Sequence, residues 1–130
     1  MKKYLAVGVG GATGAVVRYC VGQIPLPFNQ IYHPVLTMMI NMSGSFLLGL
    51  LMILFVKLLP VPSAIRLGVT TGFLGGFTTF STLCKESVLL AVSGNILLSS
   101  AYIFLSLFLG IAAAWLGIFC GKRLERRRFR

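Results

Sequence analysis

Hydroxyl and amide side chains recur at helical spacing within stretches that are otherwise apolar. Thr37, Asn41 and Ser45 are four residues apart, so a helix would place them on one face. A second stripe of this kind comprises Ser99, Tyr102 and Ser106. An amide in hydrocarbon is costly without a partner, so Asn41 must face protein or a water-filled path. Two roles are therefore open: hydrogen bonding between helices, and solvation of a polar solute.

Residues 68–83, GVTTGFLGGFTTFSTL, form the most unusual run in the chain. Adjacent glycines followed by two β-branched threonines make a poor continuous helix, so we expect a break between Gly75 and Thr79. Non-helical backbone at membrane depth survives only where it lines a cavity or is buried in protein. Carbonyls freed by such a break can coordinate a hard cation such as Na⁺.

The acid and imidazole content excludes most enzyme chemistry. Glu86 and Glu125 are the only carboxylates, and His33 is the only histidine. Paired-carboxylate catalysis and a Ser-His-Asp triad therefore lack their parts. The three cysteines lack the spacing of a metal site or a disulfide framework. Amide and hydroxyl groups with almost no acid suit an anion, and the electropositive ring edges of Phe77 and Phe80 could assist. We expect a protein that is not an enzyme.

Four apolar stretches are long enough to position these groups across a bilayer. The chain has 130 residues, of which 57% are hydrophobic and 11% charged, and its mean hydropathy is +0.93. A hydrocarbon core needs about 20 helical residues. The predicted spans are Tyr4–Ile24, Val35–Leu58, Ile65–Val92 and Ile96–Cys120, the first being retained and not a signal peptide. The uncharged segment Pro25–Gln30, prolines at 60 and 62, and Ser93-Gly94-Asn95 separate them.

Basic residues are concentrated on one predicted side of the membrane. Ten of twelve lie on the side of the two termini, and only Arg18 and Lys85 lie opposite. The positive-inside rule then places both termini in the cytoplasm. We expect one transmembrane domain, residues 1–121, and a basic tail, residues 122–130, that lies against anionic lipid and does not bind nucleic acid.

Two G-x-x-x-G motifs predict close helix contacts. They occur at Gly10 and Gly14 in the first span and at Gly72 and Gly76 in the third. Small residues at this spacing let helix backbones approach closely in lipid. Packing within the chain and packing between subunits are both open.

Three motifs together carry a family resemblance across all four spans. They are GGATGAVVRY (residues 10–19), Asn41 followed by SGSFLLG (43–49), and GGFTTFST (75–82) with Glu86 just beyond it. The chain is identified on these motifs as a member of the Fluc (CrcB) family of fluoride channels. This resemblance implies an all-α membrane protein of four transmembrane helices, the third broken at its centre. It also implies an antiparallel dimer of the dual-topology type in the cell membrane of a prokaryote.

The resemblance also implies a set of site residues. A structural Na⁺ ion that is not transported would lie at the dimer centre, bound by the backbone carbonyls of Gly75 and Thr78 of each subunit. Fluoride would leave the cytoplasm passively along a pathway formed by Asn41, Phe80, Ser81, Thr82, Tyr102 and Ser106. Possible supporting residues are Thr37, Arg18, Glu86 and Leu83.

Two features depart from the family pattern. Leu83 stands where the second phenylalanine of a pair is expected, and leucine has no polarised ring edge. The basic bias predicts a single orientation, whereas an antiparallel homodimer needs a chain that inserts both ways. These features suggest a partner of opposite orientation, a paralogue, and leave open a non-conducting subunit of a heterodimeric channel. A small multidrug-type cation/proton exporter is the more remote alternative, because it needs a carboxylate within the membrane.

Overall fold

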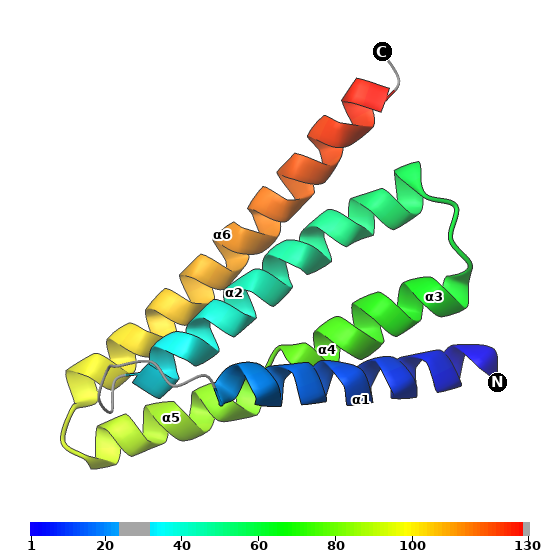
Figure 1. The fold of residues 1–130 in the computed structure, drawn as a ribbon. Helices are drawn as coiled ribbons and strands as arrows, with labels where there is room; N and C mark the ends of the chain where they lie inside the picture. The colour runs from blue at the N-terminus through cyan, green and yellow to red at the C-terminus, as the bar shows by residue number, and fades with distance from the viewer. Residues whose placement is uncertain (24–31, 129–130) are drawn as a thin grey trace.

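The computed structural model describes residues 1–23 and 32–128, and its elements are helices (Figure 1). The first two apolar stretches form α1 (Lys2–Gly22) and α2 (Tyr32–Ile53), and a π-helical turn, η1 (Leu54–Leu58), extends α2. The last forms α6 (Ile96–Arg128). The segment predicted as the third span is divided into four shorter elements: α3 (Ser63–Leu67), the π-helical η2 (Gly68–Phe73), α4 (Leu74–Phe77) and α5 (Phe80–Val92).

The predicted connections coincide with the ends of these helices. Pro60 and Pro62 lie between η1 and α3. Gly94, between α5 and α6, has a φ of 86°, a left-handed conformation that a residue without a Cβ adopts easily. The segment Pro25–Gln30, predicted as a loop, lies outside the described residues, as do residues 129 and 130 of the predicted tail.

The exposed surface of the chain is that of a multi-pass membrane protein. Among the described residues, three helices are long and apolar enough to cross a bilayer: Lys2–Gly22, His33–Leu58 and Ile96–Arg128. Large apolar side chains are widely exposed, and Phe104 and Phe108 on α6 are 71% and 72% exposed. Contiguous apolar surface of this kind is stable in lipid and a liability in water.

Close glycine contacts join α1 to the divided third segment. A Cβ at Gly10 would overlap the carbonyl of Gly68, and one at Gly14 would overlap the carbonyl of Phe73. The contact also depends on a glycine of α4, because a Cβ at Gly76 would overlap the carbonyl of Gly11 on α1. The two G-x-x-x-G motifs therefore pack within one chain, as in the first of the two interpretations left open by the sequence.

The helices form two pairs that meet near α5. In Figure 1, α2 runs beside α6, α1 runs beside α3 and α4, and the two pairs diverge toward α3. Glycines again allow the α2–α6 contact, since a Cβ at Gly117 would overlap the carbonyl of Phe46. Helix α6 continues without interruption into the basic tail. There Arg128 Nη1 donates to the Leu58 carbonyl at 2.9 Å, and Lys57 Nζ lies 4.0 Å from Glu125 Oε1.

Candidate functional site

The third segment is interrupted by two extended residues. Helix α4 ends at Phe77 and α5 begins at Phe80. Between them, Thr78 has φ −75° and ψ 155°, and Thr79 has φ −147° and ψ 119°. The interruption lies within the range 75–79 where the glycine and threonine run predicted one. Its exposed backbone groups require partners from elsewhere in the chain.

Asn41 of α2 supplies two of those partners. Its Nδ2 donates to the Thr79 carbonyl at 2.9 Å, and the Thr79 N–H donates to its Oδ1 at 2.8 Å. The side-chain amide therefore pairs with the extended backbone as a neighbouring strand would. This double hydrogen bond holds α2 to the break, across 38 residues of sequence.

The hydroxyl of Thr79 caps the start of α5. Its Oγ1 accepts from the Thr82 N–H at 3.2 Å and donates to Thr82 Oγ1 at 2.9 Å. Ser81 Oγ lies 3.3 Å from the same oxygen. A threonine at this position satisfies a backbone donor that the first turn of a helix leaves unpaired. The site prediction omitted Thr79, although its type and its place before an apolar helix gave the signal for a cap.

These two interactions release two backbone carbonyls. In a continuous helix the Gly75 carbonyl would accept from Thr79 N–H, and the Thr78 carbonyl would accept from Thr82 N–H. Both N–H groups are instead bound to side-chain oxygens. Within the described ranges no other donor replaces them. Gly75 and Thr78, the two residues predicted as cation ligands, thus carry free carbonyl oxygens, which are suitable ligands for a hard cation.

The neighbouring carbonyls are already occupied. Arg18 Nε of α1 donates to the Gly76 carbonyl at 3.2 Å, which places a positive charge at the C-terminal end of α4, where the helix dipole favours it. Thr78 donates to the Leu74 carbonyl through both its N–H and its Oγ1, each at 2.9 Å. Arg18, whose role the spacing left open, therefore stabilises one side of the break.

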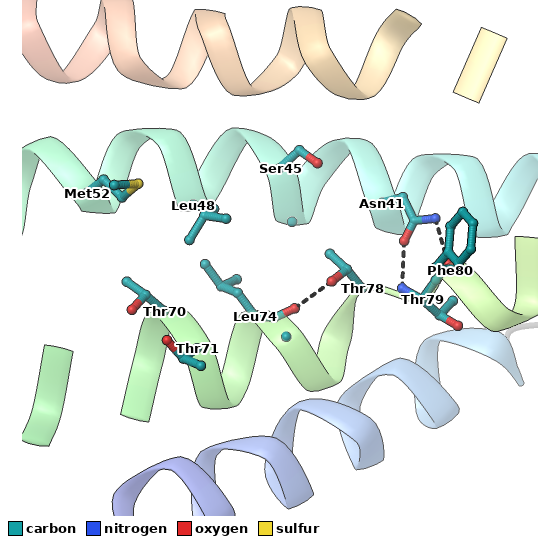
Figure 2. Close-up of a pocket in the computed structure, with 12 residues that line it drawn as sticks. Asn41, Ser45, Leu48, Met52, Thr70, Thr71, Leu74, Thr78, Thr79 and Phe80 are labelled. Atoms are coloured by element: carbon teal, nitrogen blue, oxygen red, sulfur yellow. Dashed lines mark hydrogen bonds between the residues drawn. The ribbon is translucent and has the colours of Figure 1, made fainter. Parts of the chain in front are cut away.

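An open groove of about 610 Å³ lies between α2 and the η2–α4 segment. Figure 2 shows Asn41, Leu48 and Met52 on α2 across from Thr70, Leu74 and Thr78, with Phe80 at the end beside Asn41. Both residues with free carbonyls, Gly75 and Thr78, line this groove. A Cβ added at Gly75 would meet nothing within 4 Å, so the groove is open at that point.

A second hollow of about 480 Å³ also borders Phe80. Its lining includes Asn41, Ser45, Leu83 and Ser106. Ser106 Oγ is buried and has no hydrogen-bond partner in the described part of the chain. A buried hydroxyl of this kind needs a water molecule or a solute to satisfy it. Phe80 is 79% exposed and borders both hollows.

Glu86 joins three helices in a separate cluster. Thr37 Oγ1 of α2 donates to Glu86 Oε1 at 3.0 Å, and the Tyr102 hydroxyl of α6 donates to Glu86 Oε2 at 2.7 Å. Tyr102 and Thr37 are buried, with 7% and 6% of their surfaces exposed. The carboxylate is thus satisfied by two hydroxyls.

The structure divides the predicted residues into neighbouring groups. Asn41, Phe80, Leu83 and Ser106 share the second hollow, whereas the hydroxyls of Ser81 and Thr82 gather at Thr79. Tyr102, predicted on the same polar track as Ser106, directs its hydroxyl to Glu86. Thr37, Asn41 and Ser45 do share one stripe of α2, and each of them faces protein or a hollow.

Comparisons with known proteins agree on one family. Residues 5–118 match the model of the family described as CrcB-like protein, Camphor Resistance (CrcB). The chain is 42% identical over 127 residues to the fluoride-specific ion channel FluC 2 of Carboxydothermus hydrogenoformans, covering 98% of this chain and 92% of that protein. It is 42% identical over 124 residues to FluC 2 of Geobacillus kaustophilus, covering 95% of each. It is 43% identical over 121 residues to FluC of a Hydrogenobaculum species, covering 93% of this chain and 98% of that one.

Proposed function

The chain belongs to the CrcB-like family, and on that basis we propose that it forms a fluoride-selective channel through which fluoride leaves the cytoplasm passively. An ion channel is not a class of enzyme, in keeping with the scarcity of catalytic side chains. Fluoride enters cells as neutral HF from acid surroundings and ionises in the more alkaline cytoplasm. The membrane potential then drives the anion outward by about 2.3 kcal/mol per charge per 100 mV. No coupled ion is needed for this direction of transport.

The observation that carries the proposal is the double hydrogen bond between the Asn41 side-chain amide and the backbone of Thr79. It holds an extended backbone step open within an apolar segment, and it borders both hollows. A purely structural interhelical hydrogen bond would not require a broken helix. Extended backbone in a membrane segment is tolerated where it lines a path or a binding site.

Dehydration is the main cost of moving fluoride, and the second hollow offers groups that offset it. One N–H of the Asn41 amide is bound to Thr79, which leaves the other available as a donor. Ser106 presents an unsatisfied hydroxyl in the same hollow. The ring edge of Phe80 is electropositive and can contact a desolvated anion. Glu86 is kept out of this path by its bonds to Thr37 and Tyr102, which reduces repulsion of the anion.

Free carbonyls at the break suit a structural Na⁺ ion. The oxygens of Gly75 and Thr78 are hard, neutral ligands bordering one groove. Two ligands from one chain are too few for Na⁺, so a second chain would complete the site. Bound there, the ion would add fixed positive charge beside the anion path and stabilise the unpaired carbonyls.

We propose that the second chain lies antiparallel and covers the groove and Phe80. The uncovered groove and the 79% exposed phenylalanine are what a missing partner would leave. The ten-to-two distribution of basic residues orients this chain with its termini in the cytoplasm. A partner of opposite orientation, encoded by a paralogue, would then be required.

A non-conducting subunit is the second candidate, and Leu83 favours it. Leu83 lines the hollow that contains Asn41 and Ser106, where an aromatic ring edge would otherwise assist the anion. In this case the chain would serve as a scaffold whose partner supplies the conducting pathway. A cation/proton exporter is disfavoured, because the carboxylate of Glu86 is bound by two hydroxyls.

Fluoride efflux from liposomes tests these possibilities directly. The protein is reconstituted alone, and then with its candidate paralogue, in vesicles loaded with sodium fluoride, with sodium chloride as the selectivity control. Efflux only from the pair supports an oriented heterodimer. Efflux from the single protein would contradict the heterodimer, and absence of fluoride efflux from both would contradict the channel.

A further inference from the structure

Helix α6 extends well beyond the length that a membrane crossing requires. Its 33 residues correspond to about 50 Å of helix, whereas the hydrocarbon core is about 30 Å thick. The additional turns contain the basic residues of the segment 122–128 and make contacts with the rest of the chain. Arg128 binds the Leu58 carbonyl and Glu125 lies beside Lys57, so these turns are fixed against the end of η1.

One face of these turns carries four cations, none of which forms an ion pair with another residue that the structure describes. The basic face is defined here by Lys122, Arg123, Arg126 and Arg127, all of which are exposed. The spacing places Arg126 one turn after Lys122 and Arg127 one turn after Arg123, so like charges are neighbours. Glu125, three residues after Lys122, lies at one edge of this face, and its Oε1 is 4.0 Å from Lys57 Nζ. Neighbouring like charges repel each other, and an anion that lies between them relieves this repulsion.

An aromatic pair lies directly before the basic face on the same side of α6. Trp115 and Phe119 stack with ring centroids 5.9 Å apart and are 64% and 50% exposed. At 3.6 residues per turn, Trp115 falls on the same side of the helix as Lys122 and Arg126. Tryptophan prefers the boundary between hydrocarbon and headgroups, so the basic face begins at headgroup depth.

We propose that the basic face binds the phosphate headgroups of anionic phospholipids in the leaflet where α6 ends. The inference rests on the placement of the chain in a membrane, but not on fluoride conduction. Arginine guanidinium groups bind phosphate oxygens through two parallel N–H donors, and two cations one helical turn apart can share one headgroup. The adjoining aromatic pair favours lipid over nucleic acid as the partner, because it would contact the acyl chains of the same lipid.

Trp115 is the only tryptophan in the chain and reports on this site without labelling. The full-length protein is reconstituted in phosphatidylcholine bilayers that contain brominated phosphatidylglycerol or brominated phosphatidylcholine, and quenching of Trp115 is compared. We expect about a fivefold preference for the anionic lipid, the factor expected from a single basic side chain near an anionic surface. The variant Arg123→Gln/Arg126→Gln/Arg127→Gln should lose the preference and keep its helix content by circular dichroism.

A matched variant separates a defined site from general charge attraction. Lys2→Gln/Lys3→Gln/Arg66→Gln removes the same charge from the same predicted membrane side, away from Trp115, and should retain the preference. Equal loss in both variants, or no preference in the wild type, would overturn the proposal. So would reversal of the quenching by a duplex oligonucleotide, which would identify a nucleic-acid surface. Fluoride efflux in pure phosphatidylcholine vesicles is measured alongside, so a failure of conduction is recognised separately from a failure of lipid binding.

Discussion

The amide of Asn41 and the backbone of Thr79 form a closed pair of hydrogen bonds, with donor–acceptor distances of 2.9 and 2.8 Å. One side chain thereby satisfies both polar groups of an extended residue and diverts the N–H that the Gly75 carbonyl would otherwise bind. The same contact therefore maintains the helix break, joins it to α2 and leaves the Gly75 carbonyl free. Any change at Asn41 should affect all three properties together.

Replacing Asn41 with alanine should abolish most fluoride conduction. The substitution leaves the Thr79 N–H and carbonyl unpaired, at a cost of roughly 1–3 kcal/mol for each group. We expect fluoride efflux from liposomes to fall by about tenfold or more, since 1.4 kcal/mol corresponds to a factor of ten. The matched control is Asn95→Ala, because the Asn95 side-chain amide donates to Ser93 Oγ in an exposed turn away from the break. Comparable efflux from wild type and Asn41→Ala would contradict the role proposed for the Asn41–Thr79 hydrogen bonds.

Removing the hydroxyl of Thr79 should weaken the binding of Na⁺ at the proposed site. In Thr79→Val the Thr82 N–H loses its acceptor and becomes available to the Thr78 carbonyl, which would no longer be free for the ion. Loss of the cap also costs about 0.5–2 kcal/mol of helix stability. Fluoride efflux measured over a series of Na⁺ concentrations should require more Na⁺ for half-maximal activity. Thr79→Ser keeps the hydroxyl and should behave as wild type; an unchanged Na⁺ requirement in Thr79→Val would argue against a site at these carbonyls.

Local sequence patterns predicted the helices, but partners distant in sequence could not be inferred from them. Apolar runs marked the long helices, and the run from Gly75 to Thr79 marked the interruption, because glycine and threonine propensities act locally. The partner of Asn41 depends on how α2 packs against the break, so the sequence indicated only that the amide needed one. The basic tail was recognised by its charge. Its helical continuation follows from the favourable propensities of lysine, arginine, leucine and glutamate.

The Glu86 cluster should behave as one energetic unit. Hydrogen bonds to a charged group contribute about 1.5–3 kcal/mol each, so Tyr102→Phe should destabilise the folded protein by that amount. In a Glu86→Gln background the same substitution should cost about 1 kcal/mol, since the bond then joins neutral groups. Thermal unfolding of the four proteins of this double-mutant cycle gives the coupling energy. Equal costs in both backgrounds would show that the Tyr102–Glu86 bond, 2.7 Å long, contributes little as a charged interaction.

Two glycines of α1 should respond to alanine in opposite ways. At Gly14 an added Cβ would overlap the Phe73 carbonyl, so Gly14→Ala should cost about 1–3 kcal/mol through overpacking. At Gly8 the space is open, so Gly8→Ala should be neutral or stabilise the helix by up to about 1 kcal/mol. Midpoints of thermal unfolding in detergent provide the comparison. Equal midpoints for the two variants would disprove the close approach of α1 to η2.

Leu83 offers a gain of function as the sharpest test of the anion path. Leu83→Phe would place a second ring edge in the hollow of about 480 Å³ that contains Phe80, Asn41 and Ser106. An aromatic contact of about 1 kcal/mol would raise fluoride efflux about fivefold if dehydration in this hollow limits the rate. Leu83→Met changes the shape of the side chain without adding a ring and should leave efflux unchanged. If phenylalanine and methionine have the same effect on efflux, with both proteins assembled equally, then ring edges at this position do not bind the anion, and Leu83 is a packing residue.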